Sequence, residues 1–186
     1  MKKYISILVM AMVFTIGSTF AQTYKTSTGQ IKFVSETDFE KFEAINNQVS
    51  AAITAQGKLQ FKVPVNSFEF EKKLMQTHFQ ENYMESATFP NGTFKGDFKD
   101  FQNVNLKKAG TYDVVAKGAL EIHGVSKEVE IPGKLISDGK GGITLKANFN
   151  ISCKEYGVNI PKNVVSKVSD VIKISVNCPV AEVQKK

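Results

Sequence analysis

Hydrophobic and polar residues alternate with a period of two along most of this chain, which is typical of β-strands that bury one face. The clearest run covers residues 143–153, where every second side chain from Ile143 to Cys153 is apolar and those between are polar. Seven further segments are predicted as strands: residues 30–35, 48–54, 58–65, 93–101, 112–122, 128–135 and 171–178. Turn residues, such as the sequence SDGKGG at 137–142, separate several of them.

Three segments have patterns that favour helices, and they cover residues 36–45, 71–84 and 161–169. In the middle segment, Met75, Phe79 and Tyr83 are spaced four residues apart, so they share one helix face. The third begins with Pro161, which is favoured in the first turn of a helix. We expect the middle helix to cover an opening in the fold.

Eight strands with one apolar face each, and without long parallel crossovers, favour an all-β fold. The predicted architecture is an antiparallel eight-stranded barrel with one or two short helices near its opening. Closure is favoured because it removes both exposed sheet edges. A sandwich of two sheets built from the same strands stays an alternative.

The first 21 residues have the order of a secretory signal peptide. Lys2 and Lys3 precede an apolar stretch at 4–16, and small residues lead to Ala21. We therefore expect cleavage near Ala21 and a mature domain at residues 22–186, exported to the periplasm or secreted. An uncleaved anchor is the alternative, although the apolar run is short for a membrane span.

The net charge of +6 is carried by lysine alone, because the sequence contains no arginine. Arginine is the preferred residue for reading phosphates and base edges, so we expect no nucleic-acid partner. No second apolar run of membrane-spanning length follows the first segment. At most a transient membrane contact is expected, and a homodimer stays open.

The two cysteines, Cys153 and Cys178, lie near the ends of two strands that we expect to pair in antiparallel fashion. Their ends then point in opposite directions, about 15 to 20 Å apart at the rise of a strand, whereas a disulfide needs Cα atoms within about 7 Å. We interpret both as small buried apolar residues.

The sequence lacks the common catalytic and metal-binding motifs, including HExxH, GxSxG, a phosphate-binding glycine loop and paired cysteines. We therefore predict no catalytic residue, no metal site and no cofactor. Only two histidines are present. His123 is expected to bond turn backbone at a strand end, and His78 to have a hydrogen-bonding or capping role near the barrel mouth.

The predicted interior contains several small residues, which would leave room inside a barrel: Ala116, Gly118, Gly133 and Ala147. An eight-stranded barrel is either filled by its own side chains or holds one slim ligand. An uncharged cavity suits an apolar chain, and burying ten methylene equivalents would contribute about 8 kcal/mol before ordering costs. A fully packed core is the alternative.

Three further stretches are distinctive: residues 75–84 with the Phe89–Pro90 pair, residues 118–132 around the sequence IHGV, and Tyr156, Gly157 and Val158. Together they resemble the YceI-like family of exported polyisoprenoid-binding proteins. The resemblance implies a lipocalin-like barrel that encloses the hydrocarbon tail of an isoprenoid, such as a quinone precursor, without catalysis. Many members carry an arginine or an aspartate just before the third motif, whereas this chain has Cys153, Lys154 and Glu155 there.

Carried over to this chain, the resemblance implies a ligand-binding set on the inner wall and at the mouth, with an apolar lipid of polyisoprenoid or isoprenoid-quinone type as the partner. The headgroup would lie near the helix around His78. The rival hypothesis is a structural or stress-response barrel with a packed interior that acts through its surface. The expected ligand-binding residues are Phe61, Val63, His78, Phe79, Phe94, Phe98, Leu120, Ile122, Ile131, Phe149, Ile151 and Ile174.

Overall fold

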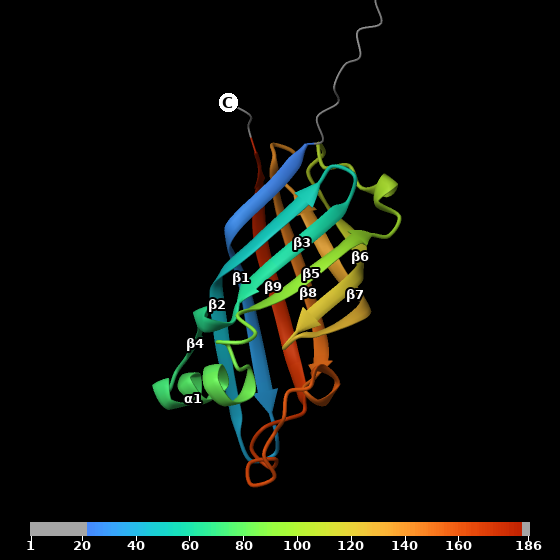
Figure 1. Ribbon diagram of the computed structural model, residues 1–186. Coiled ribbons are helices and arrows are strands. Elements are labelled where there is room, and N and C mark those ends of the chain that lie inside the picture. Colours follow the sequence, from blue (N-terminus) through green and yellow to red (C-terminus); the bar gives the residue numbers. More distant parts are fainter. Residues whose placement is uncertain (1–21, 184–186) are drawn as a thin grey trace, which may run out of the picture.

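The computed structural model describes residues 22–183, so the predicted signal peptide lies outside the described residues. Figure 1 shows an elongated barrel in which both described ends of the chain lie at the same end. Its strands are β1 (Thr23–Glu36), β2 (Lys41–Thr54), β3 (Lys58–Pro64), β4 (Phe68–Phe70), β5 (Asn91–Phe98), β6 (Gly110–Ile122), β7 (Val125–Ser137), β8 (Gly142–Ser152) and β9 (Val171–Glu182).

Eight of these strands form the closed antiparallel barrel that the sequence predicts. Neighbouring strands follow the order β1-β9-β8-β7-β6-β5-β3-β2, and the β1–β2 pairing closes the ring. The short β4 lies outside this ring order and pairs with β2 at residues 44–46. Every wall strand has two neighbours, so none of them is an edge strand along its whole length.

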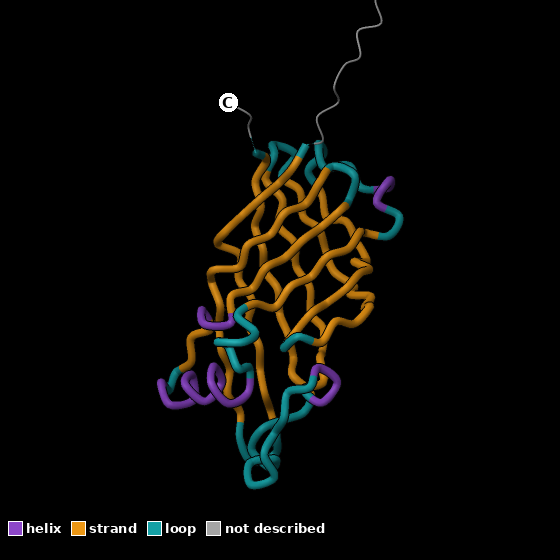
Figure 2. Tube along the Cα trace, in the orientation of Figure 1, coloured by secondary structure: helices purple, strands orange, loops and turns teal. Residues whose placement is uncertain are grey.

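The middle helix prediction is confirmed. Residues 73–83 form α1 (Lys73–His78) and the π-helical turn η2 (Phe79–Tyr83), which follows without a break. Figure 2 shows this helix beside the lower end of the barrel, opposite the chain ends. Three short 3-10 turns complete the regular structure: η1 (Val65–Ser67), η3 (Phe101–Asn103) and η4 (Lys154–Tyr156).

The helix predicted at residues 36–45 is wrong. That segment contains the end of β1, a turn at Thr37–Glu40 and the start of β2. Period-two alternation of Phe42 and Ala44 against Lys41 and Glu43 prevails there, because β2 pairs with β1 on one side and β4 on the other.

The helix predicted at residues 161–169 is also wrong, because the segment is a series of turns. Only Val168 N–H donates to a carbonyl four residues back, that of Val164, at 3.0 Å. Three valines occupy this short segment, and β-branched side chains lose rotamer freedom in a helix. A helix this short needs packing on one face to be stable.

The two cysteines are free, as predicted. In the β8–β9 pairing Cys178 lies opposite Leu145, whereas Cys153 follows the far end of β8. The register therefore places the two thiols at different levels of the barrel.

Candidate functional site

Inward-facing side chains are more exposed in one half of the barrel than in the other. Along β8, Ile143 and Leu145 are 2% and 5% exposed, whereas Ala147, Phe149 and Ile151 on the same face are only half-buried. An inward side chain keeps accessible surface only where no neighbour fills the space before it. The half of the barrel near α1 is therefore hollow, and the half near the chain ends is packed.

The hollow is a cavity of about 300 Å³. This volume lies at the lower end of the range of ligand pockets, roughly 300 to 1,000 Å³. The packed-core alternative does not describe this barrel. All twelve residues expected from the sequence lie on the cavity wall: Phe61, Val63, His78, Phe79, Phe94, Phe98, Leu120, Ile122, Ile131, Phe149, Ile151 and Ile174. That they contact a ligand stays a prediction.

Of the four small interior residues, three leave room and one does not. Ala116, Gly133 and Ala147 line the cavity. Gly118 lies opposite Gly96 in the β5–β6 pairing, and a Cβ at Gly118 would overlap the carbonyl oxygen of Lys95. Glycine is needed there for close approach of two backbones, so the expectation that Gly118 enlarges the interior is wrong.

Four phenylalanine rings form the wall beneath the helix. Phe79 of η2 contacts Phe33 at a ring-centroid distance of 5.3 Å, Phe68 at 5.5 Å and Phe70 at 5.1 Å. Edge-to-face and tilted arrangements at such distances are favourable beyond the area that they bury. Of the four, only Phe79 is among the expected binding residues. Phe33 lies in a predicted strand, whereas Phe68 and Phe70 belong to β4, which the alternation pattern did not reveal.

The end of the cavity is covered from two sides. On one side Met75, Tyr83 and Met84 extend over it from α1 and η2. On the other, Tyr156 and Val158 come from η4 and the loop that follows it. Helix and loop therefore form a cap between the cavity and solvent.

The cavity wall contains no lysine, aspartate or glutamate among the described residues. Its ionisable groups are uncharged near neutral pH or lie at the rim. Burial raises the pKa of the Cys153 thiol to about 11, and Asp170 adds to this effect. Burial likewise raises the pKa of Tyr83 and of Tyr156. Such a lining offers hydrocarbon contacts and almost no electrostatic partner.

His78 lines the cavity at the cap, but it is also exposed to solvent. It is therefore suited to meet the more polar end of a guest. His123 lies elsewhere, in the β6–β7 turn with φ 51°, followed by Gly124 at φ 74°. Its ring contacts Phe89 at 4.6 Å, and its Nε2 lies 3.5 Å from Oε1 of Glu85. These contacts tie the segment after η2 to the barrel wall.

The barrel wall has a weak side between β7 and β8. The two strands pair only from Gly133 to Ser137 of β7, so residues 125–132 have no partner on β8. Pro132, which has no N–H, comes directly before the first paired residue. Beside this stretch, Lys127 Nζ forms an ion pair with Glu155 at 3.2 Å and lies 5.9 Å from the Tyr156 ring centre. One side chain thus joins the edge of β7 to η4.

No group of three or more His, Cys, Asp or Glu side chains among the described residues could hold a metal ion. No helix within residues 22–183 is long and apolar enough to cross a membrane.

A closed antiparallel barrel with one uncharged, aromatic-lined hollow beneath a helical cap is the architecture of lipocalin-like proteins. The YceI-like domain matches residues 12–180, and this chain belongs to the YceI-like family. No curated protein matches the sequence.

Solved structures show the same fold. A polyisoprenoid-binding domain from Saccharophagus degradans, implicated in plant cell wall breakdown, has a TM-score of 0.73 at 16% identity, covering 88% of this chain and 100% of its own. BcnA of Burkholderia cenocepacia has a TM-score of 0.69 at 22% identity, covering 82% and 96%. The YceI protein of Campylobacter jejuni has 0.58 at 19% identity, covering 75% and 84%.

Proposed function

We propose that this protein binds one long apolar chain of isoprenoid type inside its barrel, and sequesters or carries it without catalysis. The observation that carries the proposal is the cavity of about 300 Å³ whose wall has no charged lysine or carboxylate among the described residues. Transfer of hydrocarbon from water into an uncharged cavity is favourable by about 0.8 kcal/mol for each methylene.

The shape of the lining supports a slim, unsaturated guest. Rings of Phe33, Phe68 and Phe79 line the cavity together with aliphatic side chains such as Ile131 and Ile174. A chain with regularly spaced methyl groups and double bonds offers contacts to both kinds of surface. The similar Saccharophagus domain is described as polyisoprenoid-binding, which supports the same class of ligand here.

We place the polar end of the guest at the cap. His78 is the histidine on the cavity wall, and its exposure lets a headgroup remain in water while the tail is buried. The buried half of the barrel, around Leu135 and Ile53, leaves no space in the other direction. The tail therefore points toward the chain ends and the headgroup toward α1.

The site of action that we propose is the periplasm or the space outside the cell. The support is the order of charged, apolar and small residues at 1–21, which is that of a cleaved signal peptide. The two free cysteines fit such a compartment, because they lie too far apart in register to form a bridge there.

Extraction of the natively purified protein with organic solvent, followed by mass spectrometry, tests the binding. We expect about one isoprenoid lipid for each chain. Phe149→Asp should abolish the bound lipid, because it places a carboxylate on the cavity wall. Asn148→Asp is the matched control, since residue 148 is the exposed neighbour on the same strand. Loss of lipid in both variants, or no lipid in the parent protein after reconstitution with polyprenol, would refute the proposal.

A further inference from the structure

The capped end of the barrel exposes large apolar side chains to solvent. Phe39 is 81% exposed in the β1–β2 turn, Leu74 is 67% exposed on α1, and Val165 is 62% exposed in the loop after η4. All three segments lie at the end of the barrel that the cap covers, the lower end in Figure 1. Val183, also exposed, follows β9 at the opposite end.

The loop at residues 157–169 connects this surface with the cavity. Val168 lines the cavity, whereas Val165, three residues earlier, faces water. The loop is fastened at its end, because Ser169 N–H donates to the buried Ser35 Oγ at 3.0 Å. This loop thus directs one apolar side chain, Val168, into the cavity and another, Val165, into solvent.

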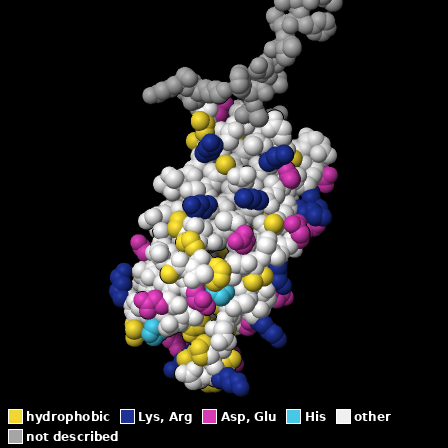
Figure 3. All heavy atoms as spheres, in the orientation of Figure 1, with side chains coloured by type: hydrophobic (Ala, Val, Ile, Leu, Met, Phe, Trp, Pro, Cys, Tyr) yellow, Lys and Arg dark blue, Asp and Glu magenta, His cyan; other side chains and the backbone are white. Residues whose placement is uncertain are grey.

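The same loop is positively charged. Residues 157–169 include Lys162 and Lys167 and no acidic residue. Neither lysine forms an ion pair within the described part of the chain. In Figure 3 hydrophobic side chains gather at this lower end beside Lys side chains.

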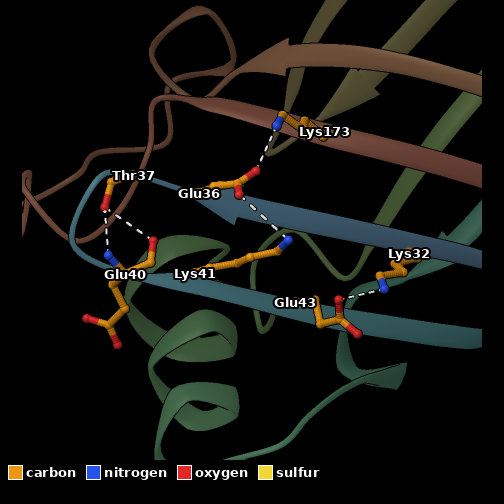
Figure 4. Close-up of polar contacts among 7 residues, drawn as sticks. All are labelled: Lys32, Glu36, Thr37, Glu40, Lys41, Glu43 and Lys173. Carbon is orange, nitrogen blue, oxygen red and sulfur yellow. Dashed lines mark hydrogen bonds and ion pairs between the residues drawn. The ribbon is translucent and has the colours of Figure 1, made fainter.

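The nearest acidic residue of β1 does not neutralise the loop. Glu36 accepts from Lys173 Nζ at 2.8 Å and lies 3.6 Å from Lys41 Nζ, as Figure 4 shows. Asp38 and Glu40 flank Phe39 in the turn. The positive apolar surface is therefore the loop, and α1, in which Leu74 follows Lys72 and Lys73, lies at the same end of the barrel.

We propose that loop 157–169, together with Leu74 of α1, docks the barrel onto an anionic lipid surface with the capped end of the cavity facing the lipid. This inference rests on the proposed function, because a guest that is insoluble in water has to be collected from a lipid phase. Exposed apolar side chains enter the headgroup region, and adjacent lysines are attracted by anionic lipids. The four features that a docking end requires, namely apolar tips, unpaired lysines, a cap and a cavity, occur together there.

Flotation of the lipid-free protein with vesicles tests the docking. We expect association with vesicles that contain 30% phosphatidylglycerol in phosphatidylcholine, and weaker association with phosphatidylcholine alone. Each lysine near such a surface contributes about fivefold to partitioning, so Lys162→Gln with Lys167→Gln should lower it about 25-fold. Val165→Asp should lower it about tenfold. Val183→Asp is the matched control and should change nothing, because it exposes the same charge at the other end of the barrel.

Equal loss of vesicle binding in Val165→Asp and Val183→Asp would overturn the proposal, as would absence of binding to the anionic vesicles. A dimer in sedimentation that Val165→Asp dissociates would also overturn it, because a second copy would then cover the surface. A parallel titration with polyprenol added from an organic stock, without vesicles, separates the two proposals. If the protein binds polyprenol but does not associate with vesicles, only the docking proposal is refuted. If it does not bind polyprenol, the proposed binding function is refuted.

Discussion

Filling the cavity from its wall distinguishes a hollow barrel from a packed one. Ala147 lines the cavity and pairs with Gly133 on one side and Val176 on the other. Ala147→Leu adds three carbons, which displace about three methylene groups of a guest. At about 0.8 kcal/mol each this costs about 2.4 kcal/mol of binding, or about 50-fold in Kd. The lipid-free protein should keep or gain stability, because the added carbons enter empty space.

The matched control is Ala51→Leu, since Ala51 is 5% exposed in the tightly packed core and does not line the cavity. Overpacking there should lower the free energy of unfolding by about 1 to 3 kcal/mol. Urea denaturation measures stability, and titration with a dansyl-labelled isoprenoid alcohol measures binding. A hollow that a guest fills is excluded if Ala147→Leu destabilises the lipid-free protein as much as Ala51→Leu does, or if it leaves Kd unchanged.

Three further predictions concern the barrel wall. The β6–β7 turn has two residues, and this register directs the even-numbered amides of β7 at residues 126–130 away from β6, toward the side where β8 provides no partner. Hydrogen exchange should therefore be faster at these amides than at the odd-numbered ones, and uniform protection would contradict this. Gly118→Ala should lower the free energy of unfolding by at least about 2 kcal/mol in urea denaturation, because its Cβ overlaps backbone, and a neutral effect would exclude the close approach. Alkylation of Cys153 at pH 8 should be about a hundredfold slower than that of a thiol with the usual pKa of 9.0, because a pKa of about 11 keeps the Cys153 thiol protonated. The alkylation rate should rise tenfold per pH unit up to pH 10, and a plateau near pH 9 would disprove the raised pKa.

The strands that sequence predicted best are those whose alternation is unbroken. β8 alternates without interruption from Ile143 to Ile151, and its inward face was predicted in full. In β1 and β2 the buried positions change phase, from Asn46 to Val49 in β2 for example. A register shift in the β1–β2 pairing at Gly29 coincides with that change. A bulge reverses which face of a strand is buried. The alternation pattern therefore predicted only one part of each strand, residues 30–35 of β1 and 48–54 of β2.

The candidate site followed from the same alternation, because side chains that face inward from eight strands must surround one axis. The sequence did not indicate the cavity-lining residues that come from short or irregular segments. Phe68 and Phe70 belong to a three-residue strand, and Val168 belongs to a loop. Such short segments carry no periodicity, and their position depends on pairing with residues distant in the chain.

The location of the guest is the central claim, and intermolecular NOEs measure it most directly. With methyl-labelled isoleucine and an unlabelled polyprenol, we expect NOEs from the chain to Ile131, Ile151 and Ile174, which line the cavity. Ile53 and Ile143, which are 0% and 2% exposed in the packed half, should show none. Saturable binding without NOEs to the three cavity methyl groups would place the lipid outside the barrel and contradict the account.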